Sequence, residues 1–587
     1  MKLNILKLAV MKTKITACHV ARVSRRQNGK LYTSVLLRRT YREGGKVKHQ
    51  TLGSLTGLPE TAIEALRRSL NGEELIPADE AFGIERSTPH GHVRAVLGTI
   101  KRLGLDALLA AKRSRERDLA VALIAERLLH PGSKLATARQ WDTSTLADAL
   151  GVADADEEEL YEAMDWLLAR QAAIEKKLAA RHLVEGGAAL YDVSSSYYEG
   201  RHCPLAKFDH NRDGKRDLPI IVYGLLTDHE GRPIGLEVYP GNTGDPTTVP
   251  DQVAKLRERF GLQRVVLVGD RGMLTQTQID NLQEHPGLGW ISALRSSAIR
   301  GLVDGGALQL SLFEQRNLAE IAAPDYPGER LVACFNPLLA EERRRKREAL
   351  LAATEKDLAQ IAAAAARRTE TPLTCEQLAE KVGHVIHRHQ MAKHFQVEYG
   401  DGSFTYARDE KSIASEAQLD GIYVIRTSEP AARLSAEDAV RGYKGLAHAE
   451  RAFRCFKGMD LLVRPIFHRE ANRVTAHIFL CMLACYVEWH MRRAWAPLLF
   501  EDEELPELRG RRDPVAPAEG SASVQRKKWT KRTRDGLPVH SFHTLLNVLA
   551  TQCRNRCRIK TASDAPTFEQ LTEPTTLQQR AYELLQV

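Results

Sequence analysis

The fold is decided by the apolar stretch AALYDV at residues 188–193, which places one acid, Asp192, at the end of a predicted strand. Residues 219–226 and 234–239 predict two further strands. The segment DHEGRP at residues 228–233 joins them, and its Gly-Arg-Pro ending is typical of a hairpin turn. These segments therefore predict three antiparallel strands.

Two α/β crossovers are predicted after these strands. Residues 247–260 predict an amphipathic helix, and RVVLVGD at residues 264–270 predicts an apolar strand that ends in Asp270. A second helix is predicted over residues 275–284 and another strand over residues 289–294. The order β-β-β-α-β-α-β is that of an RNase H-like fold. We therefore expect an α/β protein with an RNase H-like core.

Three acids are candidates for a shared site. Asp192 and Asp270 each end an apolar strand, and in this fold the two strands are neighbours, so their tips converge. Glu450 lies on the helix that follows the last strand of the core. Packed carboxylates repel each other unless a divalent cation neutralises them, and all-oxygen ligands favour Mg²⁺ or Mn²⁺. Two such ions, about 3.5–4 Å apart, activate a water or a 3′-hydroxyl and stabilise the leaving oxygen. A single Asp after a strand is more often a turn former.

The helix of Glu450 has a second pattern. It is predicted from residue 435 to Lys457, with possible kinks at Gly442 and Gly445. Tyr443, Glu450 and Lys457 are spaced by seven, so on an α-helix they lie on one face. A phenol and a cation beside a metal-binding carboxylate can hold a DNA phosphate. The alternative is a surface heptad of unrelated polar residues.

Positive charge is concentrated in two segments. The chain has a net charge of +9, but residues 1–50 hold 13 Lys or Arg against one acid, so the rest is slightly acidic. Residues 526–534 hold six cations around Trp529. Basic arms on a near-neutral body indicate a polyanion such as DNA, although solvated tails are the alternative. The candidate DNA contacts are Arg25, Arg26, Arg38, Arg39, Arg526, Lys527 and Lys528.

The chain is too long for one hydrophobic core. Residues 15–55 alternate as strands do, with a turn at Gly44 and Gly45, and residues 92–182 have helical spacing. We predict a basic β-hairpin DNA-binding module (1–90), a helical DNA-binding domain (91–185), the core (186–299 and 431–495), a β-rich and helical insertion (300–430), and a linker with a basic C-terminal helical region (496–587).

Composition excludes several classes of protein. The longest apolar run, residues 478–489, is shorter than the roughly 20 residues of a membrane-spanning helix, so it predicts a buried helix and no membrane partner. Nine cysteines, an odd number, do not form a disulfide framework, and a reducing cytosol fits best. The sequence has no P-loop or dinucleotide fingerprint, so ATP is not implied. We expect a cytoplasmic protein.

Two motifs suggest metal sites and are rejected. DHNRDG at residues 209–214 begins like a calcium loop, but Ile220 stands where a bidentate Glu is required. The pairs Cys481/Cys485 and Cys553/Cys557 lie on predicted helical stretches without companion ligands, so buried thiols are expected rather than zinc.

The pattern Tyr443-x6-Glu450-x6-Lys457 resembles the Tyr-x2-Arg-x3-Glu-x6-Lys signature of bacterial insertion-sequence transposases of the DDE superfamily, in the branch with a β-rich insertion between the second Asp and the Glu. The family's Arg position is Leu446 here, which removes one expected phosphate contact. Further similar segments follow in the correct order between residues 187 and 490, at 191–196, 209–219, 241–245, 268–273, 464–468 and 473–479.

The resemblance implies a Mg²⁺-dependent transposase in which Asp192, Asp270 and Glu450 are catalytic and bind the metals. It implies DNA cleavage at the element's terminal inverted repeats, strand transfer into target DNA, and a homodimer in the synaptic complex. Arg271, next to Asp270, is a further expected DNA contact. The expected location is the bacterial cytoplasm, associated with the nucleoid. The alternatives are an RNase H-fold nuclease without strand transfer and a domesticated DNA-binding protein without catalysis.

Overall fold

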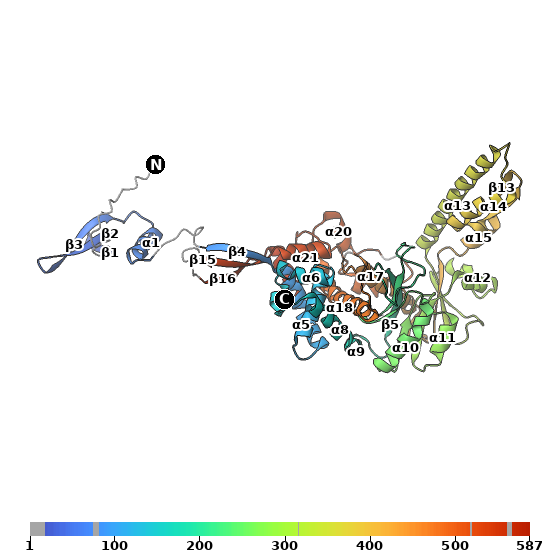
Figure 1. Cartoon of the computed structure of the whole chain (residues 1–587), viewed down its shortest axis with the longest axis horizontal. Coiled ribbons are helices and arrows are strands. Elements are labelled where there is room, and N and C mark those ends of the chain that lie inside the picture. The colour runs from blue at the N-terminus through green and yellow to red at the C-terminus, as the bar shows by residue number, and fades with distance from the viewer. Residues whose placement is uncertain are drawn as a thin grey trace. The chain divides into compact units, whose positions relative to one another are not determined.

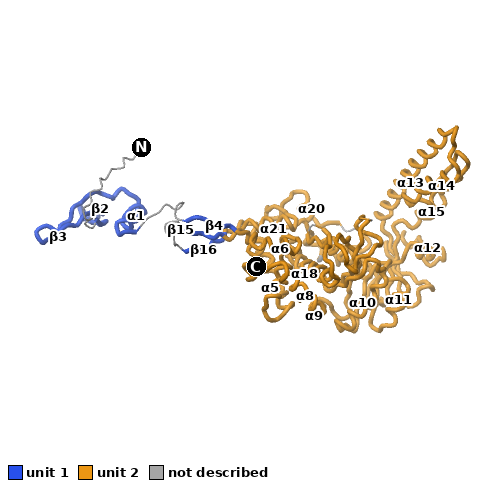
Figure 2. The backbone as a smooth tube through the Cα atoms, in the orientation of Figure 1, with its two compact units in different colours: residues 1–87, 555–571 blue, residues 88–554, 572–587 orange. Residues whose placement is uncertain are grey.

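The computed structural model describes residues 18–73 and 82–587, apart from residues 216, 315, 459, 517, 518 and 560–565. Figure 2 shows its two compact units. The first unit comprises residues 1–87 and 555–571, and the second comprises residues 88–554 and 572–587. Each unit has sheets and helices of its own, so the predicted α/β class is confirmed.

Among the residues that the structure describes, the first unit contains a three-stranded antiparallel sheet and one helix. Its strands β1 (Cys18–Gln27), β2 (Lys30–Glu43) and β3 (Lys46–Ser54) follow one another in chain order, and α1 (Glu60–Leu70) comes next. The turn at Gly44 and Gly45 is confirmed, with both residues at positive φ. Val35, Leu55 and Ile63 form a small core. The predicted hairpin is therefore a larger module of three strands and a helix.

A second small sheet joins distant parts of the sequence. The strand β4 (Phe82–Pro89) pairs in the order β16-β15-β4 with β15 (Cys553–Ile559) and β16 (Thr567–Leu571). The prediction that Cys553 and Cys557 lie on a helix is wrong, because β15 contains both. Arg554, Arg556 and Arg558 alternate with Cys553, Asn555 and Cys557. This period of two is that of a strand, and the helical interpretation overlooked it.

An eight-stranded sheet forms the centre of the second unit, in the order β10-β11-β14-β9-β8-β5-β6-β7. All the predicted strands of the core are present: β5 (Ala188–Tyr197), β6 (Ile220–Asp228), β7 (Pro233–Pro240), β8 (Val265–Val268) and β9 (Leu288–Ala293). The strands β5, β6 and β7 are antiparallel, whereas β8 pairs in parallel with both β5 and β9.

Helices cover both faces of this sheet (Figure 1). On one face, α10 (Val249–Ala254), continued by a π-helical turn to Arg259, packs beside α11 (Gln276–Gln283). On the other face, α16 (Ala436–Lys444) and α17 (Leu446–Lys457) pack against β5, β9 and β14. Alternate residues of β5 therefore face different cores: Tyr191 faces the first, and Leu190 the second.

Within the segment expected as an insertion, three strands extend the central sheet beyond β9: β10 (Leu318–Ile321), β11 (Arg330–Phe335) and β14 (Ile422–Thr427). A separate core forms between the long helix α13 (Pro337–Ala366), α14 (Cys375–His389) and the hairpin of β12 (Phe395–Gly400) and β13 (Ser403–Arg408). The short helices α12 (Ser296–Asp304) and α15 (Glu410–Ala417) complete the segment.

A helical bundle precedes the central sheet, and α18 (Ala471–Trp495) packs into it. The bundle comprises α3 (Gly91–Arg102), α4 (Leu105–Leu109), α5 (Arg115–Leu129), α6 (Lys134–Arg139), α7 (Leu146–Leu150), α8 (Glu157–Leu168) and α9 (Gln171–His182). Residues 471–498 are apolar enough to cross a membrane by composition, but 83% of the most apolar window is buried. The predicted buried helix over residues 478–489 is confirmed.

The C-terminal part adds four helices: α19 (Leu505–Arg509), α20 (Ala522–Thr530), α21 (Phe542–Ala550) and α22 (Thr576–Leu585). Of these, α21 and α22 pack against α3, and α22 also packs against α18. The chain's last helix therefore completes the bundle that begins at Gly91.

Candidate active site

Asp192 and Asp270 belong to neighbouring strands. The parallel register of β5 and β8 sets Leu190 opposite Val268, and each acid follows two residues later. Asp270 follows the end of β8, but Asp192 lies in the middle of β5, which continues to Tyr197, so the prediction that Asp192 ends its strand is wrong. Because side chains alternate along a strand, Asp192 lies on the same face as Leu190, the face covered by α16 and α17. The register therefore sets Asp192 beside the point where β8 ends.

Backbone amides fix the orientation of both carboxylates. Asp270 Oδ1 accepts hydrogen bonds from the N–H groups of Gly272 at 2.8 Å and Met273 at 2.7 Å. Asp192 Oδ1 accepts one from the N–H of Val193 at 2.8 Å. Asp192 is half-buried and Asp270 is exposed, so one acid lies inside the site and the other at its rim.

Glu450 lies on α17, which packs directly against β5. Its side chain is 61% exposed, and its carboxylate lies 3.8 Å from Arg454. Burial, with smaller contributions from the negative charges of Asp270 and Glu450, raises the pKa of Asp192 to about 6, against the lowering effects of the Val193 N–H and Arg212. Asp192 is therefore repelled by both other acids, which is the electrostatic arrangement that a bound cation relieves.

The three carboxylates do not yet enclose one point. Among the described residues, they are not a group whose ligand oxygens all lie within 4.8 Å of one another. The backbone bonds hold Asp270 in place, whereas the exposed side chain of Glu450 has rotamer freedom. The donor set, carboxylate oxygens alone, fits a hard divalent cation.

The predicted face of Tyr443, Glu450 and Lys457 is interrupted. Gly445 separates α16, which carries Tyr443, from α17, which carries the other two, so the three residues do not share one continuous helix. Burial raises the pKa of the Tyr443 hydroxyl. The charges of Asp270, Arg271 and Glu450 also act on this hydroxyl. Tyr443 therefore still borders the acids, although through a helix break.

Lys457 has a partner that sequence reasoning missed. Its Nζ lies 3.3 Å from a carboxylate oxygen of Asp213, which also pairs with Arg464. The Asp213 side chain is 5% exposed. The acid that suggested a calcium loop therefore neutralises two cations beside the active site. No spacing rule in the sequence connects residue 213 with residue 457.

Arg212 is a further missed site residue. It donates to the backbone carbonyl of Val193, next to Asp192, and its guanidinium lies 2.5 Å from Asp245. Its positive charge lowers the pKa of Asp192. Asp245 belongs to a segment that showed the family resemblance, so that resemblance was the available signal for this pair.

A cavity opens beside Asp270. Its volume is about 460 Å³, and it is lined by Asp270, Arg271, Gly272, Arg295, Ser296 and Ser297. Arg271 and Arg295 are exposed there. Two guanidinium groups beside an exposed carboxylate can accept a phosphodiester, because Arg binds phosphate oxygens in a bidentate manner. Arg295 adds to the predicted DNA contact Arg271.

The predicted basic contacts differ in accessibility. Arg25 and Arg26 on β1 and Arg39 on β2 are exposed, while Arg38 is half-buried. On α20, Arg526 and Lys528 are exposed.

Lys527 must be withdrawn from the predicted DNA contacts. Its side chain is 1% exposed, and its Nζ donates to the carbonyls of Ala496 and Glu501 and to the carboxylate of Glu503. Three internal acceptors already satisfy this ammonium, so it cannot reach a phosphate.

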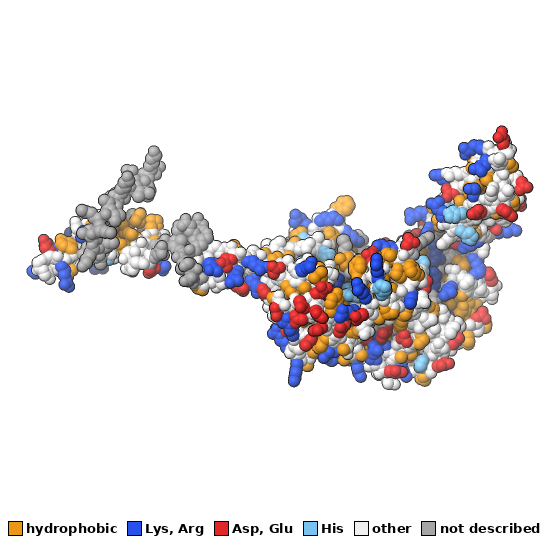
Figure 3. Space-filling view, viewed as in Figure 1, with side chains coloured by type: hydrophobic (Ala, Val, Ile, Leu, Met, Phe, Trp, Pro, Cys, Tyr) orange, Lys and Arg blue, Asp and Glu red, His pale blue; other side chains and the backbone are white. Residues whose placement is uncertain are grey.

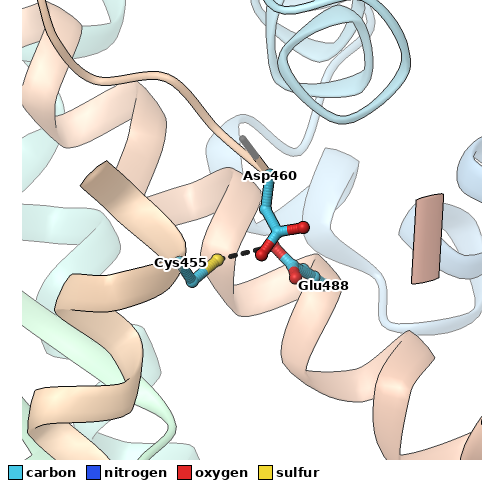
Figure 4. Close-up of side chains that lie close together, drawn as sticks. All are labelled: Cys455, Asp460 and Glu488. Carbon is cyan, nitrogen blue, oxygen red and sulfur yellow. Dashed lines mark hydrogen bonds between the residues drawn. The ribbon is translucent and has the colours of Figure 1, made fainter. Parts of the chain in front are cut away.

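One other group of metal-ligand side chains is present among the described residues: Cys455, Asp460 and Glu488 (Figure 4). The Cys455 thiol donates to Glu488 at 2.6 Å, and burial holds its pKa well above the usual range. Arg492 lies 2.5 Å from Glu488 and 3.2 Å from Asp460. The guanidinium of Arg492 supplies the positive charge that a metal ion would bring, so these side chains form an internal ion pair.

Comparisons with known proteins identify the family of the chain. Residues 20–79 match the N-terminal domain of IS1634 family transposases, and residues 206–487, which include Asp270 and Glu450 but begin after Asp192, match the transposase DDE domain. No curated protein matches the chain. A solved structure, a piggyBac transposase synaptic complex with hairpin DNA, covers 76% of this chain and 90% of its own at 11% identity, with a TM-score of 0.23, too low to support an argument. The chain belongs to the insertion-sequence transposases of the DDE type, and it is an enzyme.

Proposed function

We propose that the chain cuts DNA at the ends of its element and joins the freed 3′-hydroxyl to target DNA, with Asp192, Asp270 and Glu450 as the catalytic acids. The observation that supports this most is the parallel register of β5 and β8, which sets Asp192 beside the end of β8 where Asp270 follows, with α17, the helix of Glu450, packed against β5. The order β7-β6-β5-β8-β9, with three antiparallel strands and two parallel additions, supports an RNase H-like core.

The metal in this proposal is Mg²⁺, with Mn²⁺ as a substitute. A pair of such ions supplies an activated attacking oxygen and a stabilised leaving oxygen. The chain's own residues provide the ligands, and the backbone amides of Gly272 and Met273 orient Asp270 before any ion arrives. Arg212 adds positive charge beside Asp192, where the phosphodiester of the substrate would lie, and Lys457 is the next cation from Arg212.

DNA recognition in this proposal is divided between the units. The exposed cations of β1 and β2 bind the terminal inverted repeats, together with the helical bundle of residues 91–185. Arg271, Arg295 and Tyr443 contact phosphates near the acids. Two ends must be brought together for joining, so the working complex is a homodimer on DNA. The protein acts in the bacterial cytoplasm, at the nucleoid.

The test uses linear DNA that carries the native ends, with separate measurements of binding, cleavage and joining. Asp192→Asn, Asp270→Asn and Glu450→Gln are expected to abolish cleavage and joining while binding is kept, and EDTA is expected to do the same to the wild type. The matched control is Asp280→Asn, an exposed acid on α11, which should cleave normally. Wild-type cleavage by Asp270→Ala refutes the catalytic assignment. Cleavage without joining indicates a nuclease instead.

A further inference from the structure

The helix α20 is held rigidly against the rest of its unit. The buried Lys527 bonds to three acceptors, and the neighbouring Ser523 pairs with Glu503. At the start of the helix, the Ser521 hydroxyl accepts from the N–H of Val524, and the Ser521 N–H donates to Asp502. A short helix with these anchors presents its outer side chains in fixed positions.

Trp529 is 89% exposed on this helix, the most exposed large hydrophobic side chain among the described residues. At about 100° per residue, it lies roughly 200° around the helix from the buried Lys527 and between the exposed Arg526 and Lys528. Figure 3 shows Lys and Arg side chains gathered around a hydrophobic projection in the region of α20. Indole rings are normally largely buried, so such exposure on a rigid element indicates a binding partner.

The surroundings of Trp529 favour a polyanion with flat rings. Besides the buried Lys527, residues 526–534 contain five cations, and they contain no acid. Lys531 lies 5.3 Å from the ring centre of Phe500, which is itself 38% exposed, so a second aromatic ring borders the same surface. Cations interleaved with exposed aromatic rings are the chemistry of base-stacking sites, in which the cations hold the backbone and the rings stack on bases.

We propose that Trp529 stacks on the exposed face of a DNA base, with Arg526 and Lys528 on the flanking phosphates. An intact duplex covers both faces of every internal base, so the base must be either unpaired or the last pair of a duplex end. The inference goes beyond the catalytic assignment, and it rests on the DNA binding of the proposed function.

Three DNAs of one sequence separate these sources: a closed dumbbell whose end caps are aromatic linkers that contain no nucleobase and stack on the last pairs, the same dumbbell with one unpaired base, and a blunt linear duplex. Their affinities for the full-length protein are measured in EDTA, so that no cleavage occurs. The wild type is expected to prefer at least one DNA with an exposed base face over the closed dumbbell. A preference for the unpaired base alone identifies an extrahelical base, and a preference for the blunt duplex alone identifies a terminal pair.

Trp529→Ala is expected to remove this preference, a loss of roughly 5- to 150-fold in affinity for the preferred DNA, with the closed dumbbell unchanged. Trp529→Phe should keep most of the preference because a phenyl ring also stacks. Arg526→Ala and Lys528→Ala should weaken binding to all three DNAs equally, because phosphates are common to them. Leu338→Ala, which removes an exposed side chain from α13, is the control and should change nothing.

Equal effects of Trp529→Ala on all three DNAs, or no effect, overturn the inference while leaving the proposed function intact. A change of molecular mass in light scattering without a change of preference also overturns it, because Trp529 would then contact a second copy of the chain. If the wild type binds none of the DNAs, the proposed function fails as well.

Discussion

Asp213→Asn is the sharpest test of how the active site is supported. The carboxylate of Asp213 faces Lys457 at 3.3 Å and Arg464, and accepts from the N–H of Tyr197 at 3.3 Å. Asparagine keeps the size and one acceptor oxygen but removes the charge. Two cations then face a neutral amide in a largely buried position.

The magnitude follows from these contacts. A hydrogen bond to a charged group contributes about 1.5–3 kcal/mol, and the lower end applies because Lys457 and Arg464 are 15% and 28% exposed. The free energy of unfolding should therefore fall by about 2 kcal/mol. Cleavage should fall roughly 10- to 100-fold if Lys457 holds a substrate phosphate, since about 1.4 kcal/mol corresponds to a tenfold change.

The pH dependence has a definite sign. Burial, Arg464 and Arg212 lower the pKa of Lys457, whereas Asp213 raises it. Without Asp213 only the lowering effects remain, so the pKa falls further and more of the lysine is neutral at a given pH. The charged fraction recovers as the pH falls, so the defect in cleavage should shrink as the pH is lowered through the alkaline and neutral range.

The assay compares cleavage of end DNA by the wild type, Asp213→Asn and Asp420→Asn across this pH range. Asp420 pairs with Arg347 at 2.5 Å at the base of α13, so its substitution costs stability through a similar ion pair without touching the site. It should lower the melting temperature and leave cleavage and its pH profile unchanged. If Asp213→Asn cleaves as fast as the wild type throughout, Lys457 has no role that depends on Asp213.

Three further predictions concern charge. Arg212→Ala should slow cleavage more than it weakens DNA binding, because Arg212 faces Asp192, and equal losses in both would place it in binding alone. Glu175→Ala should lower the free energy of unfolding by about 1–3 kcal/mol, measured by urea titration, because it removes the acceptor of the buried Leu236 N–H and one of the two carboxylates beside Lys255, which keeps Glu237 at 2.8 Å; an unchanged free energy of unfolding would contradict this. Thermal stability should fall as the pH drops from about 6.5 towards 4, because unfolded histidines take up protons that the folded ones refuse, and a constant melting temperature over that window would count against it. Burial lowers the pKa of these histidines to about 3 for His468 and His490, and to about 4 for His92, His182 and His448.

The strands of the core were predictable because burial on both faces demands continuous apolar runs, as in residues 265–268. Asp192 and Asp270 stood out because each interrupts or ends such a run. The strand β15 was missed because its residues are mostly polar and pair with a strand more than 450 residues earlier, which no local pattern records. The burial of Lys527 was hidden for the same reason, since its acceptors at residues 496, 501 and 503 are distant along the chain.

The same contrast separates the parts of the active site. Asp270 is held by two amides of its own turn, so local sequence fixes both its position and its orientation. Glu450 is carried by α17, which packs across β5 after the interruption at Gly445, and its side chain remains 61% exposed. The orientation of Asp270 is therefore set by the fold before any substrate binds. In the proposed function, Glu450 completes the site from α17, so a substitution that displaces α17 should impair cleavage without changing the sheet.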